Sequence, residues 1–257
     1  MSGLKSPLWA AVTALAGITA CVSAQTVTLT LDGIRPWTTF EGHAGQKDFE
    51  DDLAGLLDFT VTSQSGTGLV PLQKLSLYSV ELQQGIGLKS TGNVYSVVGA
   101  AQASSGVHAG LSANIPLAGI GATRAASLEV LYSHVFNSHY DPGSLSDKSK
   151  SAFQLAVWEL SHDDNFDLKN ETAGGFYVET DGAAVNEAQA LVRWVQANVA
   201  TAPKMPLSAL HSSTTQDFLI PTQSYLSIIP EPSTYQLLAG LAVLSSLVWR
   251  RRIPAIR

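Results

Sequence analysis

Hydrophobic and polar residues alternate along the first half of the chain with a period of two, which is the period of half-buried β-strands. The alternation is clearest over 26–31, where threonines interleave with valine and leucine, and over 74–82. Further strand-like runs lie at 56–62 and 94–98, whereas the polar and acidic segment 42–52 is expected to be a loop. The first half of the chain is therefore predicted to be β-rich.

Further along, apolar residues recur every three or four positions, which is the spacing of an amphipathic helix. This spacing predicts a first helix from near Thr123 to before Asp141. It predicts a second helix over 146–162, with Ser146 as its N-cap, and a third over 183–199. The middle of the chain is therefore predicted to be helical.

A short strand at 174–178 and a last strand within 218–229 complete the pattern. The predicted fold class is α+β, with an antiparallel β-rich ectodomain that has a helical middle section. The two ends of the chain add an N-terminal signal helix and a C-terminal transmembrane helix. Three segments result: 1–24, 25–229 and 230–257.

Charge is distributed unevenly between these segments. The 257-residue chain has a net charge of −6, but five of its 15 basic residues and one of its 21 acidic residues lie in the terminal segments. The central segment therefore carries a net charge of −10, which repels nucleic acid and anionic lipid. The only cysteine, Cys21, lies in the first segment, so the ectodomain is expected to form no disulfide.

The N-terminus has the three parts of a secretory signal peptide: Lys5, an apolar run over 8–20, and the small residues Val22-Ser23-Ala24 before Gln25. Cleavage after Ala24 is the expected outcome. Residues 18–21 also resemble a lipobox, and cleavage there would lipidate Cys21, so both readings stay open.

The C-terminus combines Pro230-Glu231-Pro232, an apolar run over 235–249 and the basic cluster Arg250-Arg251-Arg252. The apolar run has 15 residues. As a helix it would be about 22 Å long, which is short for a bilayer core of about 30 Å. Arginines after the helix place that end in the cytoplasm and the ectodomain outside.

These residues together resemble the PEP-CTERM sorting signal, which is found on proteins exported by bacteria that make extracellular polysaccharide. The resemblance implies that an exosortase-type membrane protease or transpeptidase acts at Pro230, Glu231 and Pro232. The implied route runs through the secretion machinery to an inner-membrane intermediate held by Leu237–Trp249, and then to the cell surface or the extracellular space. Extracellular polysaccharide is a further candidate partner, and nucleic acid is not.

Two separated motifs in the central segment resemble the thioester domains of bacterial surface proteins: LYSVEL at 77–82 and AFQLAVWE at 152–159. In that family a strand cysteine condenses with a helix glutamine. Gln154 matches the glutamine, but Ser79 stands where the cysteine is expected. An unassisted serine hydroxyl is not ionised near neutral pH. Gln154 is therefore expected to hydrogen-bond buried backbone, with a Ser79–Gln154 ester as the alternative.

Other candidate chemistry is less well supported. His134 and His139 are five residues apart and do not share a helical face, so no zinc site is expected. Residues 163–167 have the D-x-N-x-D opening of a calcium loop, but Leu168 and Gly174 replace its glycine and glutamate. A solvated acidic turn is favoured over a low-affinity calcium loop. No metal, cofactor or catalytic residue is predicted.

The functional prediction is an exported, non-enzymatic structural or adhesive protein. One alternative is an adhesin that forms covalent cross-links through Gln154. The other is a secreted polysaccharide hydrolase with two facing carboxylates, for which Glu81 and Glu159 are the candidates.

Overall fold

The structure is a computed structural model of the chain. It describes residues 25–44, 47–82, 91–104, 119–137, 139–163, 165–169 and 176–222. All of these belong to one compact unit, Ala24–Ile228. The predicted signal peptide, the sorting segment 230–257 and the predicted strand residues beyond 222 lie outside the described residues. Within the described ranges no helix has the length and hydropathy needed to cross a bilayer.

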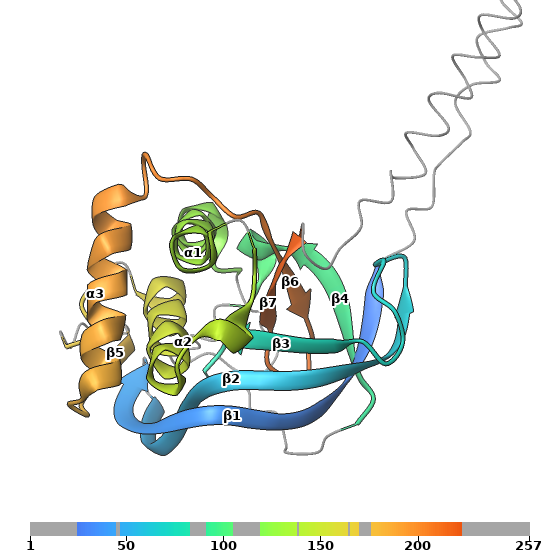
Figure 1. The fold of residues 1–257 in the computed structure, drawn as a ribbon, viewed down its shortest axis with the longest axis horizontal. Coiled ribbons are helices and arrows are strands. Elements are labelled where there is room, and N and C mark those ends of the chain that lie inside the picture. Colours follow the sequence, from blue (N-terminus) through green and yellow to red (C-terminus); the bar gives the residue numbers. More distant parts are fainter. Residues whose placement is uncertain are drawn as a thin grey trace, which may run out of the picture. The chain divides into compact units, whose positions relative to one another are not determined.

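Six antiparallel strands close into a barrel (Figure 1). Around the barrel their order is β1, β2, β3, β7, β6 and β4, and β4 pairs with β1 to complete the circle. Inward-facing apolar residues, including Val27, Leu29 and Leu31, fill the interior, as the alternation over 26–31 predicted. The bounds are β1 (Thr26–Ala44), β2 (Lys47–Ser65), β3 (Lys74–Ser79), β4 (Asn93–Gly99), β6 (Leu207–His211) and β7 (Phe218–Pro221).

Residues 42–44 and 47–52, expected to be part of a loop, are instead the end of β1 and the start of β2, which pair with each other. Asp48, Glu50 and Asp52 are exposed there, whereas Phe49 is buried and lies 5.9 Å from Phe40 between ring centroids. Strand β5 (Phe176–Val178) pairs with the end of β1. The loop prediction is wrong because acidic residues are compatible with a strand whose outer face is in water.

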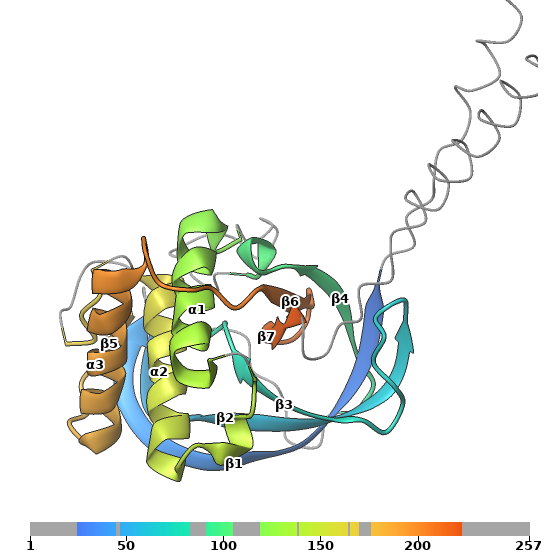
Figure 2. The same cartoon turned by 45° about the horizontal axis from the view of Figure 1, so that its top comes forward.

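Three helices pack beside the barrel, as Figures 1 and 2 show: α1 (Gly121–Phe136), α2 (Asp147–His162) and α3 (Ala183–Asn198). Two short 3-10 turns, η2 (Ala100–Gln102) and η3 (Pro142–Ser144), precede α1 and α2 respectively. The helix predictions are confirmed to within a few residues. Ser146 caps α2 as expected, because its hydroxyl accepts a 3.2 Å hydrogen bond from the Ser149 amide.

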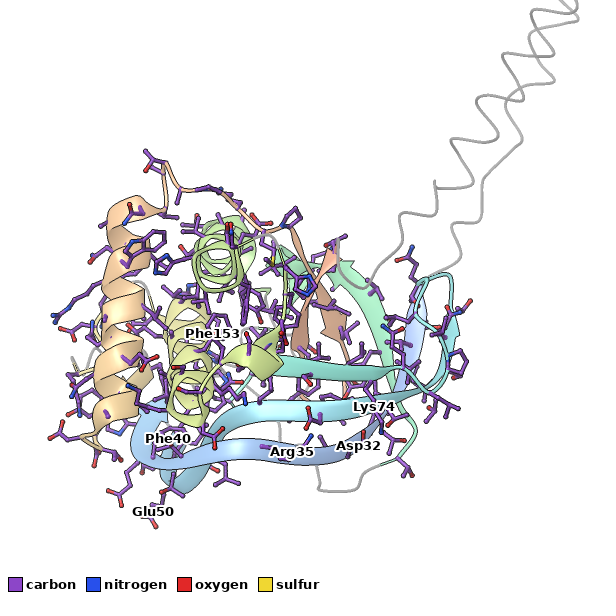
Figure 3. All side chains as sticks on the ribbon, viewed as in Figure 1. Asp32, Arg35, Phe40, Glu50, Lys74 and Phe153 are labelled. Atoms are coloured by element: carbon purple, nitrogen blue, oxygen red, sulfur yellow. The ribbon has the colours of Figure 1, made fainter. Side chains whose placement is uncertain are left out.

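Helix α2 is the centre of this layer. It contacts α1 and α3 on one side and β1, β2 and β3 on the other, and its residues 151–162 are all buried. The opposite, outer side of the hairpin is charged. Figure 3 shows Asp32 and Arg35 of β1 with Lys74 of β3, and the Lys74 ammonium donates a 2.9 Å hydrogen bond to Asp32. Helix α2 buries polar side chains that could be expected in water, among them Gln154, Glu159, Ser161 and His162.

Candidate functional site

The two residues of the thioester-like motifs meet at the C-terminal end of β3. The Ser79 amide donates to Oε1 of Gln154 at 2.9 Å, and Nε2 of Gln154 donates to the Ser79 carbonyl at 2.8 Å. Strand β3 pairs with β2 only over Lys74–Leu77, so its next outward-directed peptide groups have lost that neighbour. The side-chain amide of Gln154 supplies the donor and the acceptor that an adjacent strand would have supplied.

The Ser79 hydroxyl is engaged elsewhere, since it donates to the Glu81 carbonyl at 2.9 Å. Two turns further along α2, Ser161 Oγ lies 3.2 Å from the Val80 carbonyl. Helix and strand end are thus joined at two points, through Gln154 and Ser161. Such bonds are required because a buried peptide group without a partner costs about 1 to 3 kcal/mol.

Beside this junction lies a buried polar cluster built around Glu81 and Asp217, both 0% exposed. Glu81 Oε2 accepts a 2.9 Å hydrogen bond from the Asp217 amide. Burial, reinforced by the Asp217 carboxylate, raises the pKa of Glu81 from 4.5 to about 7. The Asp217 carboxylate accepts 2.8 Å bonds from the amides of Ser104 and Ser212 and from Nδ1 of His211.

Glu159 is also 0% exposed, but its surroundings differ. Burial and the nearby Asp163 carboxylate raise the pKa of Glu159 from 4.5 to about 8, against the opposing effect of the Asp167 amide. Glu159 is thus influenced by Asp163 and Asp167, whereas Glu81 is influenced by Asp217. Two fully buried carboxyls in separate surroundings do not form the open facing pair that glycoside hydrolysis requires.

The loop after α2 uses its polar side chains to hold its own backbone. Asp163 accepts a 2.9 Å bond from the Asn165 amide, and Asn165 accepts a 2.8 Å bond from the Asp167 amide. His134 stacks on Trp194 with ring centroids 3.6 Å apart. Among the described residues, no group of three or more His, Cys, Asp or Glu side chains is arranged to hold a metal ion.

Sequence reasoning missed Asp217, His211 and Ser104. Asp217 lies in the turn before β7, His211 ends β6 and Ser104 follows η2, so no short motif contains all three. The one available signal was the position of an aspartate and a histidine at either end of a Ser/Thr-rich turn, SSTTQ over 212–216.

Comparison with known proteins identifies the C-terminal segment. Residues 229–252 match the family model described as the PEP-CTERM protein-sorting motif. The chain therefore carries this sorting signal, as predicted, and is an exosortase substrate exported through the membrane to the cell surface or the extracellular space. No curated protein and no solved structure matches the chain. Nothing in these comparisons supports the resemblance to thioester domains.

Removing the Gln154 amide should destabilise the fold more than removing the Ser79 hydroxyl. Gln154→Leu leaves the amide and carbonyl of Ser79 buried without partners, so we expect a loss of about 2 to 4 kcal/mol in the free energy of unfolding. Ser79→Ala retains both backbone bonds and should cost about 1 kcal/mol. Urea denaturation measures both values. If both variants lost the same free energy of unfolding, the pairing between the Gln154 amide and the Ser79 backbone would not be the more important interaction.

Stability should fall as the pH rises from 6.5 to 8. Folded Glu81 and Glu159 keep protons that the unfolded chain releases near pH 4.5, so raising the pH favours unfolding until about pH 8. Burial lowers the pKa of His162 to about 4, which has the opposite effect but only below pH 6.5. We expect a loss of about 1 to 2 kcal/mol over this window.

Glu159→Gln should remove most of that loss, because its neutral amide does not titrate. Glu187→Gln is the matched control, since the ion pair with Lys148 lowers the pKa of Glu187 and leaves it ionised throughout the window. Denaturant midpoints at pH 6.5, 7.2 and 8 test this. A free energy of unfolding that stays constant in the unmodified protein would refute the assignment of buried protons.

Proposed function

We propose that the ectodomain is a non-enzymatic structural or adhesive module of the cell surface or extracellular matrix. The observation that carries this proposal is the sorting signal at 229–252, which determines where the ectodomain is delivered. The ectodomain itself is a disulfide-free barrel stabilised by a large helical core. A module that persists outside the cell without disulfides must derive its stability from such a core.

The chemistry of the buried groups supports a non-catalytic role. Glu81 and Glu159, the candidates for a hydrolase, and Gln154, the candidate for cross-linking, are each 0% exposed and so out of reach of a polymeric substrate. Both hydrogen-bonding atoms of the Gln154 amide are used by the Ser79 backbone. We propose extracellular polysaccharide as the partner, since the chain is exported and its central charge of −10 disfavours nucleic acid.

The sorting route is tested by changing the tripeptide. With Pro230→Ala, Glu231→Ala and Pro232→Ala combined, we expect the unprocessed chain to stay in the membrane fraction, because exosortase loses the residues presented outside the bilayer. Immunoblots of membrane and culture fluid follow both forms. Ser233→Ala with Thr234→Ala is the neighbouring control and should be processed normally. Unchanged release of the triple variant would contradict the route.

A second candidate function, covalent cross-linking through Gln154, is favoured by one observation: the Gln154 amide lies directly against Ser79. An ester between them would expel ammonia. We expect the purified ectodomain to have its full sequence mass, because the Ser79 hydroxyl is bonded to the Glu81 carbonyl and no thiolate is available. Intact-mass spectrometry decides. A deficit of one ammonia that disappears in Ser79→Ala would establish the cross-linker.

A further inference from the structure

A shallow depression of about 570 Å³ lies on the barrel surface where β4 meets the β6–β7 turn. Its wall is made of short polar side chains with one apolar residue, Val94, which is 59% exposed. The polar residues that matter for recognition are Asn93, Ser96, His211, Ser213 and Thr214. Ser96 and His211 are direct cross-strand partners, and such pairs present their side chains on the same face of a sheet.

The side chain of His211 is held by a hydrogen bond to a buried carboxylate, that of Asp217. The histidine side chain is 37% exposed, yet Nδ1 is 2.8 Å from the carboxylate of fully buried Asp217. Asp217 is in turn fixed by two backbone amides, from Ser104 and Ser212, while its own amide donates to Glu81. When the neutral imidazole donates its Nδ1–H to the carboxylate, Nε2 is left as an acceptor in a fixed orientation.

The described segments around the depression contain no Asp, Glu, Lys or Arg, although the ectodomain is acidic. No residue of the described segments 25–31, 91–104 and 212–216 carries a charge. These segments are adjacent, because Thr26 pairs with Ser96 and the Thr215 hydroxyl donates to Tyr95. An anionic polymer gains no ion pair here and is repelled by the acidic surface of the rest of the ectodomain.

We propose that this depression binds a neutral polysaccharide. Hydroxyl groups of a sugar both donate and accept, as do the side chains of Ser96, Ser213 and Thr214, and Nε2 of His211 adds a fixed acceptor. Val94 offers an apolar contact for the C–H face of the sugar. The inference rests on the proposed adhesive function and deepens it by naming the ligand class and the surface.

The test uses two matched valines of the exported protein. Val94→Glu puts a charge into the depression, whereas Val70→Glu puts one into the turn between β2 and β3, where Val70 is 57% exposed. The probes are dextran, galactomannan and laminarin as neutral polymers, and alginate as an anionic one. Affinity electrophoresis in gels containing each polymer gives apparent dissociation constants.

We expect at least one neutral polymer to retard the protein and alginate not to. Val94→Glu should weaken that retardation at least about tenfold, because a charged side chain replaces the apolar contact with the C–H face of the sugar, and Val70→Glu should not. Binding of no neutral polymer, or equal binding by both variants, would overturn the inference. Export and matrix retention of the same variants are scored separately, so a failed site is distinguishable from a failed function.

Discussion

The bidentate pairing between the Gln154 amide and the Ser79 backbone joins the two layers of the ectodomain. Strand β3 leaves β2 after Leu77, and its next residue with groups directed to that side is Ser79. Without an amide at position 154 those two groups would be buried against an apolar helix. The Gln154 amide satisfies both groups and, together with the Ser161–Val80 bond, holds the helix against the end of β3, which explains why a glutamine lies in a fully buried stretch.

The same constraint accounts for a second polar residue of α2, Ser161. Ser161 reaches the Val80 carbonyl on the face that Gln154 occupies two turns earlier. Glu159 and His162 are buried on other faces, and burial shifts the pKa of each toward its neutral form. A core that contains neutral carboxyls is less stable once they lose their protons, so the stability of this module depends on pH more than its surface charge suggests.

The elements with strong periodicity were predictable: the three helices, the Ser146 cap and the alternating strands at 26–31 and 74–79. The hairpin end at 42–52 was not, because its acidic residues obscured the buried Phe49, and β6 was missed because LSALH over 207–211 is too short to show a period. The Ser79–Gln154 juxtaposition was anticipated from two motifs. The Asp217 cluster was not, since tertiary structure alone brings its members together.

A continuous set of hydrogen bonds links the surface depression to the central helix. His211 bonds to Asp217, the Asp217 amide bonds to Glu81, and the Glu81 carbonyl accepts from the Ser79 hydroxyl. The backbone of that same serine is held by Gln154. An imidazole supported in this way is restrained by the helical core and not only by its own turn. Because a ligand gains most from groups whose orientation is fixed beforehand, a partly exposed histidine held in this way at the end of β6 is suited to the recognition role proposed for it.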